Sequence, residues 1–147
     1  MNRRLFLKQS IAITSVATAV SFGLLTPIKA FANTSAFKAL SKKTQQQLSN
    51  AQEGKFVLKA PEIAENGAMV PITIDASHIP AVKNIAIYVH NNKVPLSVYF
   101  EILEASAFIT TRIKMAETSV VTAVVGTESG SFIRNKTVKV TLGGCGG

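Results

Sequence analysis

Apolar and polar residues alternate in steps of two along most of the chain from Lys55 onward, which is the period of a β-strand with one buried face. Turn residues separate the alternating stretches, as in Glu65-Asn66-Gly67 and in Gly126 to Gly130. Val120 to Val125 is apolar on both faces and is predicted to be a central strand. The other strands are predicted to turn inward Phe56, Leu58 and Ala60; Val70, Ile72 and Ile74; Ile85, Ile87 and Val89; Val98, Phe100 and Ile102; Ile109, Ile113 and Met115; and Val138, Val140 and Leu142.

Seven short strands with turn signals about every 8 to 12 residues predict an all-β fold, an immunoglobulin-like antiparallel β-sandwich of about seven strands. Pro71 and Pro95 lack the amide hydrogen that a strand ladder uses, so both are predicted at edges, strand starts or bulges. The chain has one cysteine and no tryptophan. Neither a disulfide nor a buried tryptophan therefore indicates the strand order.

A short helical pattern precedes the strands, from Asn33 to Ala51. Thr34 or Ser35 can cap its amino-terminal end. The helix is expected to dock on the sandwich or on a partner, and the alternative for its first half is an unstructured linker. Its apolar face is predicted to contain Phe37, Leu40, Leu48 and Ala51, and its polar face Lys42, Lys43 and Gln45 to Gln47.

The first 32 residues have the order of an export signal, a basic segment followed by an apolar one. Small residues in Ala30-Phe31-Ala32 predict cleavage before Asn33. The alternative is a retained membrane anchor over Ser10 to Leu25, but this stretch has polar interruptions and is shorter than the roughly 20 residues that span a bilayer. The residues that resemble a twin-arginine (Tat) signal are Arg3, Arg4, Phe6, Leu7 and Lys8. We therefore expect export by the Tat machinery to the periplasm.

The positive charge of the chain lies partly in this signal. Four of the sixteen basic residues and no acid lie in residues 1–32, so cleavage lowers the formal net charge from +8 to +4. The remaining basic residues are dispersed and are not interleaved with aromatic residues, which argues against a nucleic-acid surface. A moderate positive charge suits anionic substrates or partners.

Cys145 is the single cysteine, and the sequence places it between two glycine pairs after the last predicted strand. A lone cysteine cannot form an internal disulfide, so it is free, modified or joined to another molecule. A free thiol with a pKa of about 8.5 is mostly protonated at neutral pH, and this segment contains no base, cation or helix end to activate it. An exposed, unactivated thiol suits a carrier whose partner enzymes supply the activation.

The ending Val140-Thr141-Leu142-Gly143-Gly144-Cys145-Gly146-Gly147 resembles the terminus of the SoxY family, the sulfur-carrier subunits of the bacterial thiosulfate-oxidising (Sox) system. The resemblance implies that Cys145 is the site of covalent sulfur attachment. It also implies a swinging arm formed by Gly143, Gly144, Gly146 and Gly147. The expected organisation is a signal peptide over 1–32, a helix and linker over 33–54, a sandwich over 55–142 and an arm over 143–147.

The resemblance also implies the partners of the chain: a heterodimer with SoxZ, loading by the haem enzyme SoxAX, release of sulfate by SoxB and further oxidation by SoxCD in some systems. It implies no bound cofactor apart from the sulfur intermediate and no stable membrane anchoring. Two other classes of function stay open on the residues alone. One is an interaction module that forms a mixed disulfide through its tail, and the other is a redox enzyme that uses Cys145 without a resolving cysteine.

The remaining polar residues give no other site. His78 and His90 are the only histidines, and neither belongs to a cluster with metal-ligand spacing, so both are predicted to be loop or strand-end residues. The spacing of Asp75, Glu101 and Glu104 is that of solvated strand edges. No catalytic residue and no metal ligand is therefore predicted.

Overall fold

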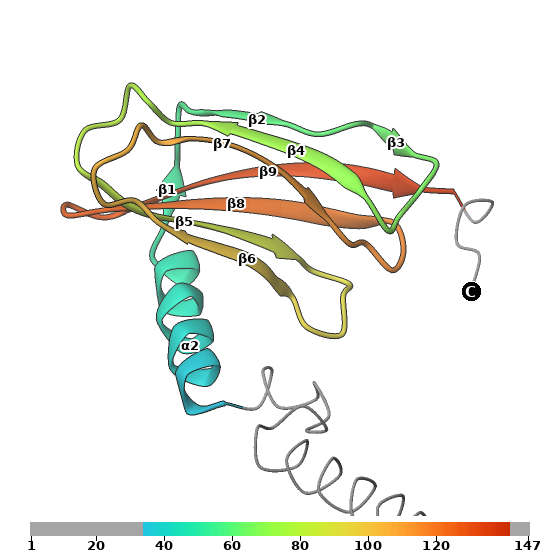
Figure 1. The fold of residues 1–147 in the computed structure, drawn as a ribbon, viewed down its shortest axis with the longest axis horizontal. Helices are drawn as coiled ribbons and strands as arrows, with labels where there is room; N and C mark the ends of the chain where they lie inside the picture. Colours follow the sequence, from blue (N-terminus) through green and yellow to red (C-terminus); the bar gives the residue numbers. More distant parts are fainter. Residues whose placement is uncertain (1–33, 142–147) are drawn as a thin grey trace, which may run out of the picture. The chain divides into compact units, whose positions relative to one another are not determined.

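The computed structural model describes residues 34–141, which form one helix and nine strands (Figure 1). The helix is α2, Ser35–Ser49. The strands are β1 Gln52–Glu53, β2 Val57–Lys59, β3 Ile63–Ala64, β4 Val70–Asp75, β5 Val82–Val89, β6 Leu96–Glu101, β7 Phe108–Ile113, β8 Ser119–Thr127 and β9 Ser131–Val140. No helix within this range is long and apolar enough to span a bilayer.

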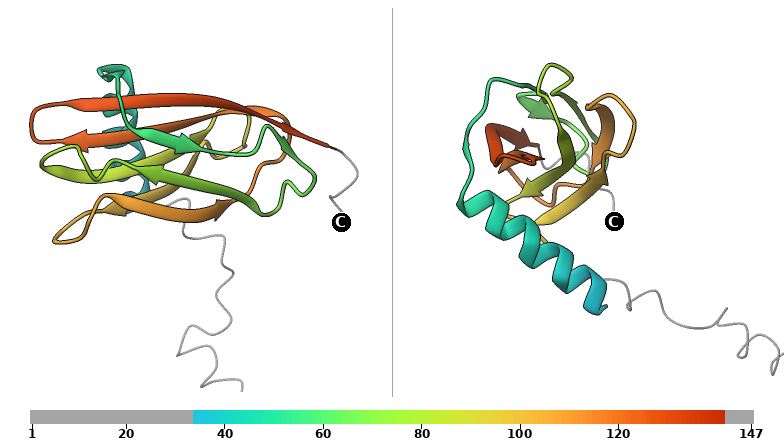
Figure 2. Two further views of the ribbon diagram at one scale, coloured as in Figure 1. Left: turned by 90° about the horizontal axis from the view of Figure 1, so that it is seen from above. Right: turned by 90° about the vertical axis from the view of Figure 1, so that its left-hand side faces the viewer.

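The strands form two sheets that face each other, as the end-on view in Figure 2 shows. The larger sheet has the order β1-β9-β8-β5-β6, with β3 also paired to β9, and the smaller sheet has the order β2-β4-β7. The predicted all-β sandwich is therefore confirmed, with nine strands in place of seven. The two additional strands, β1 and β3, contain two residues each, which is too short for a period of two to be recognised.

The hydrophobic core lies between the two sheets and follows the predicted alternation. Val70, Ile72 and Ile74 of β4 are buried against Ile85 and Ile87 of β5 and their neighbours in one cluster. β8 is the central strand that its apolar sequence predicts, since it pairs with β5 on one side and with β9 on the other. The other predicted inward residues that join the cluster are Phe56, Leu58, Ala60, Val89, Val98, Ile102, Ile109, Ile113, Met115, Val138 and Val140. Phe100 was also predicted to face inward, but it is half-buried and does not join the cluster. Leu142 lies outside the described residues.

Part of the outer face of the larger sheet is covered by α2. The hydroxyl of Tyr88 in β5 donates a hydrogen bond to Thr44 Oγ1 in the helix at 2.5 Å. Thr44 is fully buried, and Leu40 and Leu48 are only half-buried. Burial raises the pKa of Tyr88, and the bond to Thr44 opposes this rise. The helix therefore docks through a polar contact of Thr44, a residue outside the apolar face that the sequence predicted.

Two expectations near this helix were wrong. Gln47 was expected to face water, but it is half-buried over Gly126. Gly126 was expected in a turn, but β8 continues to Thr127 and Gly126 pairs with Ser131. A Cβ atom at position 126 would lie 2.6 Å from Gln47 Nε2 and 2.6 Å from Asn84 Oδ1, so glycine is needed here to admit both side chains.

The helix cap and the two prolines lie where they were predicted. Thr34 Oγ1 accepts a hydrogen bond from the backbone N–H of Phe37 at 3.3 Å, as an N-cap residue does. Pro71 is the second residue of β4, and β2 pairs with β4 only from Thr73 onward, so its missing N–H breaks no ladder bond on that side. Pro95 directly precedes β6.

Candidate functional site

The predicted site residues lie outside the described residues. This applies to Cys145 and Gly143, Gly144, Gly146 and Gly147 at one end of the sequence, and to Arg3, Arg4, Phe6, Leu7 and Lys8 at the other. The described structure that bears on the carrier hypothesis is the end of β9 at Val140, five residues before Cys145. We call the residues that hold this end, Ala64, Gly67, Met115, Thr118 and Val140, the tail root.

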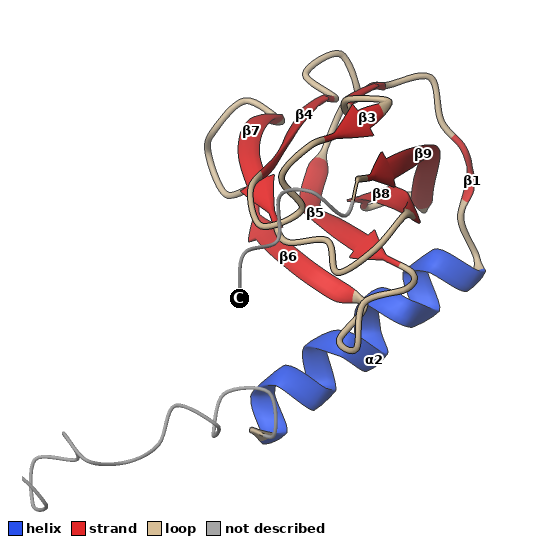
Figure 3. Cartoon of the chain, turned by 90° about the vertical axis from the view of Figure 1, so that its right-hand side faces the viewer, coloured by secondary structure: helices blue, strands red, loops and turns tan. Residues whose placement is uncertain are grey.

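The end of β9 is hydrogen-bonded on both sides. On one side β3 runs parallel to it, with Ile63 opposite Lys139, and the N–H of Thr141 donates to Ala64 O at 3.1 Å. On the other side, the pairing of β9 with β8 ends at Val138, which lies opposite Ser119. Beyond that pair, the N–H of Val140 donates to the side-chain oxygen Thr118 Oγ1 at 2.9 Å. Figure 3 shows the molecule from this end. The chain is therefore held firmly up to Thr141.

Gly67 lies against two parts of the tail root. Its carbonyl oxygen accepts a hydrogen bond from Met115 N at 2.7 Å. A Cβ atom at this position would lie 2.5 Å from Met115 O and 2.9 Å from Val140 Cγ1. The absence of a side chain is therefore what allows the loop before β4 to touch both the loop after β7 and the end of β9.

Two asparagines connect the next loop to the tail root, and the sequence analysis did not identify them. Asn91 Nδ2 donates to Thr118 O at 2.9 Å, and the backbone N–H of Asn91 donates to Ser119 Oγ at 3.0 Å. Asn92 Nδ2 donates to Lys114 O at 2.7 Å, while Asn92 Oδ1 accepts from the N–H of Ala116 at 3.0 Å. The adjacent asparagines were a recognisable turn signal, but their partners are more than 20 residues away in sequence.

The surface beside β3 is apolar and exposed. Ile63 is 59% exposed and Met69 is 55% exposed. They line an open depression of about 440 Å³ together with Pro61, Glu65 and Pro71. This depression adjoins β3, the strand that pairs with the end of β9.

The two histidines lie where the sequence predicted them, in a turn and at a strand end. His78 Nε2 is 2.8 Å from Lys55 O. His90 directly follows β5, and its Nε2 is 2.8 Å from Thr122 Oγ1, which in turn donates to Asn135 Oδ1 at 2.7 Å. No group of three or more potential metal ligands occurs among residues 34–141.

Two carboxylates have lowered pKa values, and both effects are local to turns away from the tail root. Hydrogen bonds from the hydroxyl and the N–H of Ser77 lower the pKa of Asp75. The Lys83 ammonium, 2.8 Å away, lowers the pKa of Glu128. Neither shift indicates an acid or base poised for catalysis, because each has an ordinary structural cause and each carboxylate is exposed.

Comparison with known proteins identifies the family. The family described as "Sulfur oxidation protein SoxY" matches residues 39–145, a range that includes Cys145. Among solved structures, the sulfur carrier protein SoxY from Chlorobium limicola f thiosulfatophilum is 35% identical, with a TM-score of 0.59 over 74% of this chain and all of that one. A comparison with curated proteins found no match.

Other solved structures share the fold alone. Two variants of the superoxide reductase neelaredoxin from Ignicoccus hospitalis are 16% and 15% identical, with TM-scores of 0.54 and 0.52. They cover 64% and 68% of this chain, and the match spans 86% and 87% of theirs. The family match, by contrast, extends over residues 39–145, and the identity to a SoxY structure is 35%. The chain therefore belongs to the SoxY family of sulfur oxidation proteins.

Proposed function

We propose that this chain is a periplasmic carrier that holds sulfur intermediates covalently on Cys145 while partner enzymes load, oxidise and hydrolyse them. The observation that carries the proposal is that the family match extends to Cys145, the single cysteine of the chain. With one thiol, the chain offers one position for a thiol-linked intermediate.

The chemistry follows from the nature of a thiol. In the loading step the Cys145 sulfur bonds to the outer sulfur of thiosulfate, which gives Cys–S–S–SO₃⁻, a proton and two electrons. A haem partner of the SoxAX type accepts the electrons. Hydrolysis by a partner of the SoxB type then consumes one water and yields Cys–S–SH, sulfate and a proton. Loading replaces the S–H bond of Cys145 with a sulfur–sulfur bond. Hydrolysis breaks the bond to the sulfonate, forms a sulfur–oxygen bond and moves a proton of water to the remaining sulfur. We assign these proton transfers to the partner enzymes, because the segment around Cys145 contains no acid or base.

The tail root supports this division of labour. Hydrogen bonds on both sides hold β9 up to Thr141, so the fold presents the following residues from a fixed point. Four residues of extended chain reach about 14 Å. A glycine-rich segment of that length can enter the active site of a partner enzyme without any change in the sandwich.

Further parts of the proposal concern partners and export. We infer a heterodimer with SoxZ and transient contacts with SoxAX, SoxB and, where present, SoxCD. Residues 1–32 are proposed to direct export through the Tat machinery. The exposed Ile63 and Met69 beside the tail root are available for such contacts.

A second candidate function is an interaction module that forms one permanent mixed disulfide through Cys145. Intact mass spectrometry of the protein purified from cells grown with and without thiosulfate separates the two candidates. We expect thiosulfate-dependent mass increases that map to the peptide containing Cys145 and disappear on reduction. A single disulfide-linked partner under both conditions, with no sulfur adduct, would refute the carrier proposal.

A further inference from the structure

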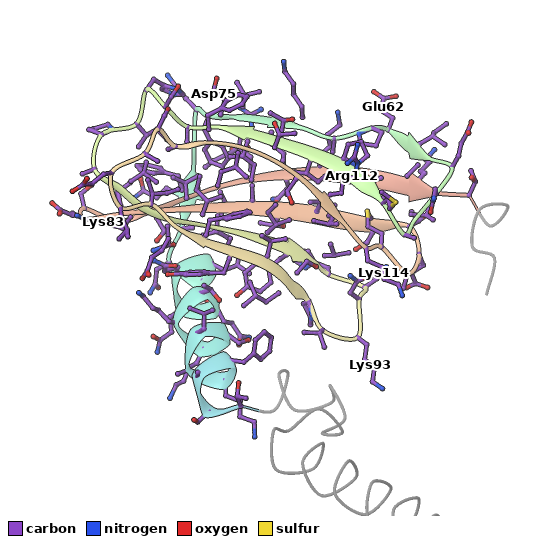
Figure 4. All side chains as sticks on the ribbon, in the orientation of Figure 1. Glu62, Asp75, Lys83, Lys93, Arg112 and Lys114 are labelled. Atoms are coloured by element: carbon purple, nitrogen blue, oxygen red, sulfur yellow. The ribbon has the colours of Figure 1, made fainter. Side chains whose placement is uncertain are left out.

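Two lysines flank a small depression next to the tail root. Lys93 lies in the loop between β5 and β6, and Lys114 lies in the loop between β7 and β8 (Figure 4). They line an open depression of about 300 Å³ together with Asn92, Val94 and Ala116. The hydrogen bonds between Asn92 and the 114–116 segment hold its two walls together.

Both cations lack an anionic partner within the described residues. The ion pair between Lys83 and Glu128 is the only one that residues 34–141 form. Glu117, the nearest acid in sequence, pairs with neither lysine. Two exposed ammonium groups with three donors each are therefore free to bind an oxyanion.

The depression is connected directly to the tail root. Lys114 and Ala116 flank Met115, which is hydrogen-bonded to Gly67. Thr118, two residues beyond Ala116, binds the N–H of Val140 at 2.9 Å. Two residues span at most about 7 Å, so Ala116 at the edge of the depression lies within roughly 13 Å of the end of β9, and four extended residues give Cys145 a reach of about 14 Å.

Two other depressions close to the tail root do not suit an anion. The one beside β3 is apolar and contains the carboxylate of Glu65. The larger one beside α2, about 580 Å³, contains hydroxyl and amide groups with His90 as its only ionisable residue. The depression between Lys93 and Lys114 is the one that combines free cations with an apolar wall, supplied by Val94 and Ala116.

We propose that this depression is a resting site for the anionic end of the sulfur adduct on Cys145 of the same chain. The sulfonate oxygens bind the ammonium groups of Lys93 and Lys114, and the sulfane sulfur lies against Val94. This inference rests on the proposed function, because the adduct is its ligand. Such a site holds the loaded arm between visits to partner enzymes, and because the lysines are solvated the hold is weak enough for release.

The adduct for the test is made without any partner enzyme. The Cys145 thiolate attacks an inner sulfur of tetrathionate, which gives Cys–S–S–SO₃⁻ and releases thiosulfate, with no other oxidant required. Alkylation of a second sample with iodoacetamide gives an uncharged adduct of similar length. The protein is purified in the form that cells produce after exporting it. Amide spectra of the ¹⁵N-labelled protein are recorded for both adducts and for the free thiol.

We expect the anionic adduct, but not the neutral one, to shift the amide signals of Lys93, Val94, Lys114 and Ala116. The double variant Lys93→Gln/Lys114→Gln should reduce these shifts by roughly 2- to 10-fold, the range that two solvent-exposed ion pairs supply. Salt at about 0.5 M should reduce them in the unmodified chain as well. The matched control is Lys55→Gln/Lys59→Gln, which removes the same charge near Asp75 and should leave the shifts unchanged.

Three results would overturn the inference. The first is an absence of shifts at these four amides, the second is equal shifts for the neutral adduct, and the third is shifts that grow with protein concentration, which would place the adduct on a second copy. The test is independent of the proposed function, because the adduct is made chemically. A failure of Cys145 to carry sulfur in cells is detected by intact mass and not by these spectra.

Discussion

The two ends of the sandwich are held together differently. At the tail root the contacts join loops that are distant in sequence: Val140 to Thr118, Asn92 to the 114–116 segment and Gly67 to Met115. At the opposite end, hydrogen bonds within single turns occur beside distant contacts such as Ala76 N–H to Ala107 O. Thr127 Oγ1 donates to Gly130 O within one hairpin, and Asp75 accepts from Ser77 two residues away.

The charges differ in the same sense. At the far end Lys83 is paired with Glu128, whereas Lys93 and Lys114 beside the tail root have no anionic partner within the described residues. The far end therefore has a lysine whose charge is neutralised by a carboxylate of the fold. The tail root is an interlocked support with two unpaired lysines beside it, and this arrangement suits the proposed carrier of anionic intermediates.

The largest effect on function is expected when the thiol is moved from the tail to the opposite end of the sandwich. Cys145→Ser should abolish thiosulfate-dependent turnover in a reconstituted system, because no sulfur remains to be loaded, and leave the free energy of unfolding within about 0.5 kcal/mol. The combined variant Cys145→Ser/Ser129→Cys places a thiol in the far-end turn, where Ser129 is exposed.

The relocated thiol should react with a small alkylating reagent at a rate within a few-fold of the native one and still not support turnover. Both rates are measured on one preparation. Restored turnover would show that any exposed thiol suffices and that the tail root has no role in presentation.

A smaller but still functional loss is expected from the glycines next to the thiol. Gly144→Val together with Gly146→Val restricts the backbone and adds bulk on both sides of Cys145. Alkylation by a small reagent should stay nearly constant, while loading by partner enzymes should fall by at least about tenfold, since these enzymes must admit the segment. If both rates fell together, simple thiol reactivity would explain the glycines, and if neither fell, the swinging arm would be refuted.

Stability should respond more strongly at the tail root than at the far end. Gly67→Ala places a Cβ atom 2.5 Å from Met115 O, and displacing backbone costs about 1–3 kcal/mol. Gly130→Ala meets no atom within 4 Å and carries only the strain of its φ of 156°, about 1 kcal/mol. Urea unfolding of both variants checks the order, and a larger loss for Gly130→Ala would contradict it.

A single hydrogen bond tests the same contrast on a finer scale. Thr118→Val removes the acceptor of the Val140 N–H and should speed hydrogen exchange of that amide by about 2- to 10-fold, the equivalent of one modest hydrogen bond. Thr127→Val removes a hydrogen bond within one hairpin and serves as the control. Unchanged exchange at Val140 in the Thr118 variant would mean that water replaces the hydroxyl without cost.

The smallest effect is expected from the far-end ion pair. Lys83→Gln should raise the pKa of Glu128 toward its ordinary value of 4.5, because the ammonium that lowers it is gone. A lowered pKa in the folded state means that the pair stabilises the fold above pH 4.5 and that this contribution is lost as the pH falls through the folded value. An NMR titration of Glu128 measures the shift, and no change would show that the pair is absent in solution.

The strands and their inward faces could be predicted because alternation is a local property of the chain. Val70, Ile72 and Ile74 all face the core, because residues two apart in a strand point to the same face of the sheet. The docking of α2 on the sandwich was one of two expectations, but the contact by which it docks could not be predicted, since this is a polar pair, Thr44 with Tyr88, 44 residues apart. The prediction that Gln47 faces water was wrong for a related reason, because only the fold brings Gly126 next to its side chain.

Three features can be recognised from neighbouring residues alone: the period of the strands, the single thiol between glycine pairs and the resemblance to one family. Three others become visible only in the folded chain: the pairing of β3 with β9, the contact of Gly67 with Met115 and Val140, and the depression that Lys93 and Lys114 share. These pairs are separated by 21 to 76 residues in the chain, and no local pattern encodes which loops meet when two sheets close on a common core.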